Sequence, residues 1–170
     1  MRQQGVTLIQ LAAAVGLLML LTKLAMPTYT RMNMDLQQQV AAELLAQALR
    51  TARSEALLRN QVVRVSPREG LWQKGWQIAL EEDGADLLRE VTLSGRVRIV
   101  GNQPVAQQVR FSGLGVALQA GGAFQAGTLH ICESPGTRSV YQVVLSRSGK
   151  VSLRQALKEQ PLCAAAGSDQ

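Results

Sequence analysis

Few side chains in this 170-residue chain are of the types that carry out catalysis or bind metals. There is one histidine, His130, and there are two cysteines, Cys132 and Cys163. Because zinc and most transition-metal sites need several such ligands at short spacings, the sequence excludes zinc fingers and most multi-ligand metal sites. Motifs of serine hydrolases, zinc proteases and P-loop proteins do not occur, and Gly113 and Gly115 lack the third glycine of a dinucleotide-binding loop. We therefore expect no enzyme, no metal and no cofactor.

The positive charge of the chain is concentrated in its C-terminal half. The whole chain has 18 lysines and arginines against 12 acidic residues, and residues 91–170 alone contain eight basic and three acidic side chains. Lysine and arginine that neutralise phosphates give salt-sensitive, sequence-independent binding to nucleic acids. A net charge of this size is also common on an ordinary soluble surface. Composition alone leaves both interpretations open.

The most distinctive segment of the sequence is an apolar run near the N-terminus. Residues 6–26 contain a single charge, Lys23, and a helix of this length is about 30 Å long, the thickness of a bilayer's hydrocarbon core. A polar leader, residues 1–5, precedes the run, and Pro27 follows it, where proline kinks or breaks a helix. We expect a transmembrane helix over residues 6–27. The alternative, a cleaved secretory signal, lacks an A-x-A-like site at its far end.

The segment after Pro27 has the periodicity of an amphipathic helix. Between Asp35 and Arg59 apolar residues recur every three to four positions, and Asn60 is a typical helix stop. The predicted apolar stripe comprises Leu36, Val40, Leu44, Ala48, Ala52 and Ala56, widened by Leu45, Leu49 and Leu57. We therefore expect one helix of about fifty residues, with its first half in lipid and its second half, residues 28–60, lying on a folded domain.

Residues 61–170 change to a period of two, which predicts a β domain of six or seven short strands. The alternating apolar positions are Val63, Val65, Trp76, Ile78, Leu80, Val91, Leu93, Val97, Ile99, Val109, Phe111, Leu129, Ile131, Tyr141, Val143, Leu145, Val151 and Leu153. Asp83-Gly84 and Ser148-Gly149 are the best hairpin turns, and residues 161–170 are expected to form a tail. The predicted fold class is α+β, with a long N-terminal helix packed on an antiparallel sheet.

The junction between leader and apolar run, Gly5-Val6-Thr7-Leu8-Ile9-Gln10-Leu11, resembles the processing site of type IV pilins and type II secretion pseudopilins, usually G, F, T, L, I, E, L. The resemblance implies that prepilin peptidase cleaves between Gly5 and Val6 and methylates the new amino terminus. Gln10 replaces a glutamate that, in the family, pairs with the amino terminus of a neighbouring subunit. Pilins also carry a proline at the offset of Pro27, so the resemblance assigns Gln10 and Pro27 to subunit docking.

The replacement at Gln10 changes the expected strength of that docking. A buried ammonium without its counter-charge is costly, whereas a neutral amide can still accept a hydrogen bond at a smaller desolvation cost. We therefore expect weaker docking onto a preceding subunit. This favours a low-abundance or tip-located component over a major pilin.

Four further stretches are similar to the GspH/FimT/FimU family of minor pilins and minor pseudopilins. They are Ala52-Arg53-Ser54-Glu55-Ala56, Trp72-Gln73-Lys74-Gly75-Trp76, 109–115 and 143–151. The resemblance implies a pilin-like subunit that crosses the bacterial inner membrane once, has a periplasmic C-terminal domain and packs with other minor and major pilins or pseudopilins. It also implies a role in priming or capping assembly of a type IV pilus, which we favour, or of a type II secretion pseudopilus.

The implied compartment bears on the cysteines and the histidine. An oxidising periplasm lets a disulfide persist, so we expect Cys132 and Cys163 to be bonded, although two buried unpaired thiols are the alternative. Closing this loop would contribute ~3 to 4 kcal/mol by restricting the unfolded chain. His130 alternates with Ile131 on a predicted strand, so we expect it to face solvent or a satisfied polar contact rather than a ligand.

An alternative function is DNA binding for uptake in natural transformation. Some FimT-like proteins are DNA receptors with a Gly-Arg-x-Arg pattern, and this chain has Gly149-Lys150-Val151-Ser152 at the matching position. The first basic position is thus retained and the second is lost. The candidate DNA-binding residues are Arg147, Lys150, Arg154 and Lys158.

Two features argue against DNA binding. No aromatic stacking platform is evident in the sequence. The positive charge is spread over residues 91–170, and such a spread is common on an ordinary soluble face. The pattern recurs at Gly95-Arg96-Val97-Arg98, where we expect both arginines simply to share the solvent side of a strand, opposite Val97 and Ile99.

Overall fold

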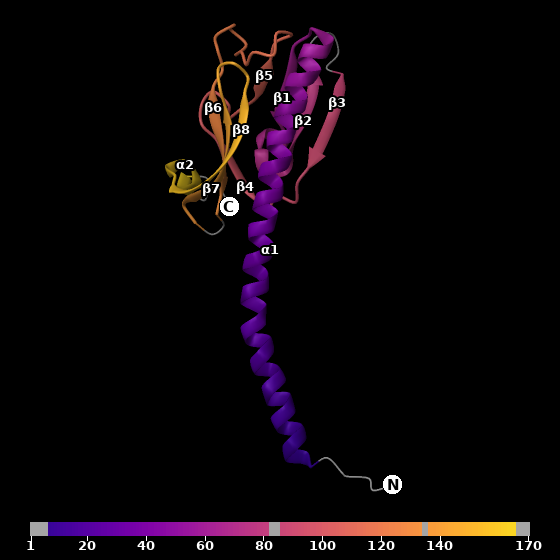
Figure 1. Ribbon diagram of the computed structural model, residues 1–170, viewed down its shortest axis with the longest axis vertical. Coiled ribbons are helices and arrows are strands. Elements are labelled where there is room, and N and C mark those ends of the chain that lie inside the picture. The colour runs from indigo at the N-terminus through magenta and orange to yellow at the C-terminus, as the bar shows by residue number, and fades with distance from the viewer. Residues whose placement is uncertain (1–6, 82–85, 134–135, 166–170) are drawn as a thin grey trace. The chain divides into compact units, whose positions relative to one another are not determined.

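The computed structural model describes residues 7–81, 86–133 and 136–165. The chain divides into two compact units, Met1–Leu36 and Gln37–Gln170. One helix, α1 (Leu8–Arg59), has 52 residues and contributes to both units, which confirms the predicted helix of about fifty residues (Figure 1). Pro27 lies within α1, and the helix continues through it. Proline removes one backbone hydrogen bond, and the bonds on either side of it continue the helix.

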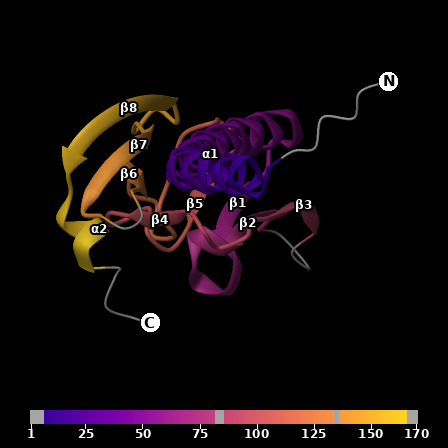
Figure 2. The same ribbon diagram turned by 90° about the horizontal axis from the view of Figure 1, so that it is seen from below.

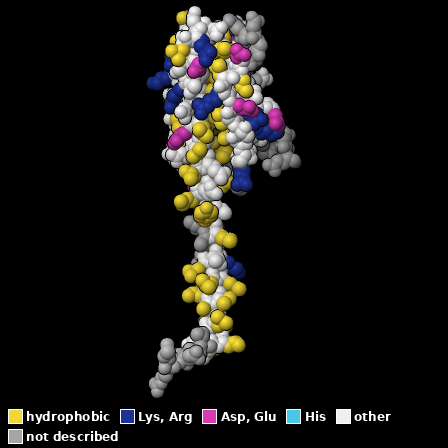
Figure 3. Space-filling view, turned by 90° about the vertical axis from the view of Figure 1, so that its right-hand side faces the viewer, with side chains coloured by type: hydrophobic (Ala, Val, Ile, Leu, Met, Phe, Trp, Pro, Cys, Tyr) yellow, Lys and Arg dark blue, Asp and Glu magenta, His cyan; other side chains and the backbone are white. Residues whose placement is uncertain are grey.

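In the first unit, α1 exposes many large apolar side chains. Leu8, Ile9, Leu17 and Leu18 are each at least 60% exposed, and Figure 3 shows apolar side chains along this part of the helix. Within the described ranges no helix is long and apolar enough to cross a membrane, so the predicted span over residues 6–27 is not confirmed.

In the second unit, α1 buries a face made mostly of alanine. The fully or almost fully buried residues are Ala41, Ala42, Leu45, Ala46, Ala48, Leu49, Ala52 and Ala56. Leu36 and Val40, which belonged to the predicted stripe, are 57% and 45% exposed. Leu36 is the last residue of the first unit. Sheets cover two sides of the helix farther along (Figure 2), so small side chains beside the predicted stripe, such as Ala41 and Ala46, are buried as well. Alanine on this face lets the strands approach the helix closely.

The described part of the β domain contains eight strands in two antiparallel sheets, one more strand than the upper expectation. Sheet A has the order β3-β2-β1-β5 and sheet B the order β4-β6-β7-β8 (Figure 2). The strands are β1 (Val63–Pro67), β2 (Gly75–Leu80), β3 (Leu87–Thr92), β4 (Arg98–Gly101), β5 (Val109–Phe111), β6 (Gly127–Cys132), β7 (Arg138–Leu145) and β8 (Val151–Glu159). Two short 3-10 helices, η1 (Arg68–Gly70) and η2 (Trp72–Lys74), join β1 to β2. The predicted α+β class, a long N-terminal helix packed on antiparallel sheets, is confirmed.

A single core joins both sheets to the helix. Its largest fully buried side chains include Trp76 and Phe111 from sheet A, Ile131 from sheet B and Leu45 from α1. The predicted turn at Ser148-Gly149 does join β7 to β8, whereas Asp83-Gly84 lies outside the described residues. The expected C-terminal tail contains a short helix, α2 (Pro161–Ala165).

Candidate functional site

The sequence-predicted processing site lies at the edge of what is described. Gly5 and Val6 fall outside the described residues. Gln10 lies in the first turn of α1, where its Oε1 accepts a hydrogen bond of 3.1 Å from the Thr7 N–H. This is one half of a capping box, which satisfies a backbone donor at a helix start. Gln10 therefore has a role within its own chain, one that the resemblance did not suggest.

Three of the stretches that resemble the pilin family meet at the end of α1. Arg53 Nε donates to the Gly115 carbonyl at 2.8 Å, and Arg53 Nη2 donates to the Ser148 carbonyl at 3.3 Å. Gly149 has a φ of +77°, and a Cβ there would lie 2.1 Å from the Gly115 carbonyl oxygen. We call Arg53, Gly115, Ser148 and Gly149 the helix-end junction. It locks α1, the loop after β5 and the β7–β8 turn together.

The Trp72–Trp76 stretch is also structural. Trp72 is 3% exposed, and its Nε1 donates to the Ala106 carbonyl at 2.7 Å. Gly75 has a φ of +111°, and a Cβ there would lie 2.0 Å from the Val91 carbonyl oxygen. These contacts position the elements of the fold.

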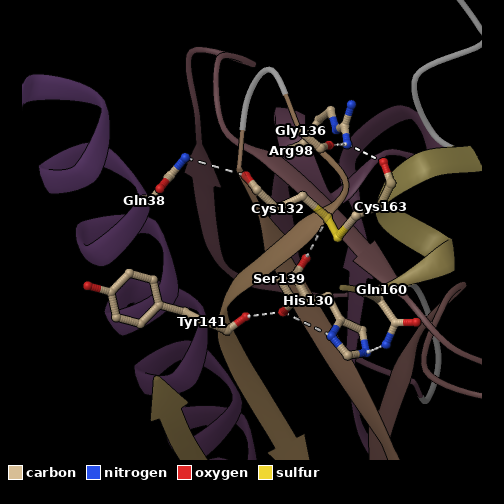
Figure 4. The surroundings of a disulfide bond; sticks show 9 residues. All are labelled: Gln38, Arg98, His130, Cys132, Gly136, Ser139, Tyr141, Gln160 and Cys163. Atoms are coloured by element: carbon tan, nitrogen blue, oxygen red, sulfur yellow. Dashed lines mark hydrogen bonds between the residues drawn. A yellow bond between two sulfur atoms is a disulfide. The ribbon is translucent and has the colours of Figure 1, made fainter. Parts of the chain in front are cut away.

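A second cluster, which we call the C-terminal clasp, holds α2 on sheet B (Figure 4). The predicted disulfide is present and joins Cys132 at the end of β6 to Cys163 in α2, with a Cα–Cα distance of 5.6 Å. Arg98 Nη2 donates to the Gly136 carbonyl at 2.9 Å and to the Cys163 carbonyl. Gln160 contacts His130 and completes the clasp.

His130 is buried, with 5% of its surface exposed, inside a short hydrogen-bond chain. Its Nδ1 lies 3.1 Å from Ser139 Oγ, which donates to the Tyr141 carbonyl at 3.2 Å (Figure 4). Its Nε2 lies 3.1 Å from Gln160 Nε2. A neutral ring satisfies this chain, since Nε2 can accept from the amide while Nδ1–H donates to the hydroxyl. The ring thus occupies one of the two environments predicted for it, a satisfied polar contact.

This environment predicts a pH-dependent stability. Burial lowers the pKa of His130 below its ordinary value of 6.5. The unfolded chain therefore binds a proton more readily, so the stability contributed by the neutral ring is complete above about pH 6.5 and is lost as the pH falls. Thermal unfolding of the full chain between pH 7.5 and 5.5 should show a falling midpoint, and His130→Gln should flatten that fall. The comparison is clean because the chain has no other histidine. An equal slope in both proteins would contradict the assignment.

The four candidate DNA-binding residues form a line and not a compact cluster. Arg147 and Lys150 lie in the β7–β8 turn, and Arg154 and Lys158 lie on β8. All four are exposed, and none forms an ion pair with another residue that the structure describes. At about 3.3 Å per residue, Lys150 and Lys158 are roughly 26 Å apart.

Arg98 differs from the sequence expectation. It was expected on the solvent side of a strand, but it binds two backbone carbonyls under α2. The alternation of β4 does place it opposite Ile99, and α2 then covers that side. The one sequence feature that could have suggested this cover is Cys163 in the tail, because its disulfide holds α2 here. Among the described residues, no group of His, Cys, Asp and Glu could hold a metal ion.

The comparisons with known proteins agree with this geometry. A family model described as "Type II transport protein GspH" matches residues 41–149. Two crystal structures of the Pseudomonas aeruginosa type IV minor pilin FimU are similar in fold. The first has 25% identity and a TM-score of 0.60 over 74% of this chain and 93% of that chain; the second has 24% and 0.59 over 74% and 98%. A search of curated proteins found no match.

Proposed function

The chain belongs to the GspH family of minor pilins and minor pseudopilins, and we propose that it primes or caps assembly of a type IV pilus. Proteins of this family are structural subunits of the bacterial envelope and its filaments. The single observation that carries the role as a filament subunit is the match over residues 41–149, which includes the helix-end junction.

One observation favours a pilus over a secretion pseudopilus. The similar crystal structures are of a type IV minor pilin, and the first shares 25% identity with this chain. Gln10 in place of the usual glutamate fits a low-copy starting or tip subunit of either filament, because a neutral amide docks a charged amino terminus less strongly. A role in a type II secretion pseudopilus is the alternative within the family.

In this mechanism, catalysis is done to the protein and not by it. Prepilin peptidase cuts between Gly5 and Val6, and residues 6–27 anchor the mature chain in the inner membrane with the β domain in the periplasm. During assembly this helix leaves the lipid and packs with the helices of other pilin subunits. The exposed leucines of the first unit, such as Leu17, supply the apolar surface that such packing would bury.

A photoreactive amino acid in place of Leu17 tests this role. Leu17 is 60% exposed on α1, so the probe should not disturb packing within the chain. In cells, adducts with other pilin-like subunits are expected after illumination. Gly5→Val should leave an unprocessed precursor and reduce those adducts at least tenfold. Adducts of equal yield in the Gly5→Val protein, or none in processed protein, would rule out the proposed assembly step.

A second candidate function, DNA binding, is favoured by the four exposed cations of the β7–β8 hairpin, which form no ion pair with any residue in the described ranges. Full-length chain in detergent should then shift a DNA oligonucleotide in a gel at low salt. Lys150→Gln with Arg154→Gln should weaken the shift and reduce the slope of log affinity against log salt by about 2. No shift at low salt would eliminate this candidate.

A further inference from the structure

We propose that the free edge of β8 is a docking site for an extended, acidic strand of another filament subunit, which adds to sheet B as a fifth strand. The identity of the partner rests on the proposed assembly function. The edge itself is a property of this chain, since β8 ends the sheet order β4-β6-β7-β8 (Figure 2). The strand is also the longest described one, with nine residues.

The direction of the β8 backbone groups follows from two hydrogen bonds. Ser146 N–H donates to the Lys150 carbonyl at 3.0 Å, so Ser146 and Lys150 form a hydrogen-bonded pair. In an antiparallel ladder every second pair is hydrogen-bonded, so Ser152 and Arg154 also direct their N–H and C=O toward β7. On the other side of sheet B, Asn102 N–H donates to the Thr128 carbonyl, which fixes the same alternation through β6 and β7. The residues between them, Val151, Leu153 and Gln155, therefore direct N–H and C=O away from the sheet.

Only the start of this edge is covered. Arg50 Nη2 donates to the Val151 carbonyl at 3.5 Å, so α1 shields the first outward-facing residue. No described residue hydrogen-bonds to the outward groups of Leu153 or Gln155. An unpaired strand edge of this kind is a template for strand addition, in which main-chain hydrogen bonds supply affinity.

The charges along the edge select the partner. Lys150, Arg154 and Lys158 are exposed, and no acidic residue lies between the first and the last of them. Like charges facing each other across paired strands are destabilising, so β8 does not favour pairing with β8 of a second copy. A partner strand with carboxylates opposite Arg154 and Lys158 would instead form opposite-charge pairs, which stabilise strand pairing. Leu157, 65% exposed, offers an apolar contact to the added strand.

Strand addition fits this surface better than DNA does. The cations follow one strand, and the one aromatic residue of β7 and β8, Tyr141, packs against the core instead of offering a base-stacking face. DNA would use the cations alone, whereas an added strand also needs the outward N–H and C=O of Gln155. This difference gives the test.

The experiment uses full-length chain in detergent and a synthetic peptide of alternating glutamate and valine, with an alternating lysine and valine peptide as control. Binding is followed by fluorescence anisotropy, and hydrogen exchange is read at the Leu153 and Gln155 amides. Gln155→Pro removes one outward N–H of an exposed edge residue without touching the hydrogen bonds to β7. Gln155→Ala is the matched control, because it keeps that N–H. An oligonucleotide is tested in parallel.

We expect the acidic peptide to bind, to slow exchange at both amides, and to bind about tenfold more weakly to Gln155→Pro than to Gln155→Ala. Arg154→Gln with Lys158→Gln should weaken it as well. Equal binding to both Gln155 variants, unchanged exchange in the unmodified chain, or binding of the oligonucleotide alone would overturn the proposal. The exchange measurement stands even if Gln155→Pro fails to fold. Failure here would leave the Leu17 adducts intact, so the two proposals fail separately.

Discussion

Gly149→Ala is expected to lower the free energy of unfolding by about 3 kcal/mol. Two effects combine at this residue. Its φ of +77° is a left-handed conformation that costs an L-residue about 1 to 2 kcal/mol. The new Cβ would also lie 2.1 Å from the Gly115 carbonyl oxygen, which accepts the 2.8 Å hydrogen bond from Arg53 Nε. Relieving the contact moves that oxygen, so a bond of the helix-end junction is weakened too. The midpoint of thermal unfolding should fall by roughly 6 to 12 °C.

Two other glycines separate these effects. Gly122 has a φ of +80°, and a Cβ added there would meet nothing within 4 Å, so Gly122→Ala should cost only the backbone strain, about 1 kcal/mol. Gly121 has neither constraint, so Gly121→Ala should be close to neutral. If Gly149→Ala costs no more than Gly122→Ala, the contact with Gly115 does not hold the junction.

Loss of the disulfide is the second large effect. Replacing Cys132 and Cys163 together by alanine should lower the free energy of unfolding by about 3 to 4 kcal/mol. The bond closes a sequence separation of 31 residues, and its loss restores the conformational freedom of that loop in the unfolded chain. Removing both cysteines avoids a lone thiol. Denaturant unfolding of the full chain, compared with and without a thiol reductant, measures the effect.

The double alanine variant has a local signature as well. Without the bond, α2 is held mainly by Arg98 and by the contact of Gln160 with His130. Water should then reach His130, and the fall in stability between pH 7.5 and 5.5 should become smaller. A loss of stability below 1 kcal/mol with an unchanged pH slope would show that the clasp holds without its disulfide.

The long elements were predictable because their periodicity is strong. The helix that ends at Arg59 and the left-handed Asn60 after it, with a φ of 52°, agree with the predicted stop. The alternation also located most strands, since side chains of successive strand residues point to opposite faces. One run, residues 91–99, was misleading. The start of this run belongs to β3 in sheet A and its end to β4 in sheet B. Alternation of side chains along a segment does not indicate which sheet the segment joins.

Neutral amides and one arginine were not predictable. Gln125 is 2% exposed and accepts a hydrogen bond from the Arg110 N–H at 3.0 Å while donating to the Gln108 carbonyl at 2.7 Å. Gln38, in α1, is equally buried. Both residues look like surface residues in the sequence, because their burial depends on partners distant in the chain. The burial of Arg98 was not predictable for the same reason, because the helix that covers it, α2, begins only at residue 161.

Some parts of the candidate site could likewise be predicted from the sequence and others could not. The disulfide could be predicted from the compartment that the family resemblance implies, and the structure confirms it. The helix-end junction could not, because it depends on backbone carbonyls of Gly115 and Ser148. The processing site at Gly5 and Val6 remains a prediction from the pattern of residue types around it.

The N-terminus of the chain isolated from cells tests the central proposal most directly. Mass spectrometry combined with N-terminal sequencing should find a mature protein that starts at Val6 with a methylated amino group. In a strain without prepilin peptidase the same chain should keep Met1. A mature protein that retains Met1 in peptidase-containing cells, or that starts beyond Pro27, would contradict the proposed role as a pilin subunit.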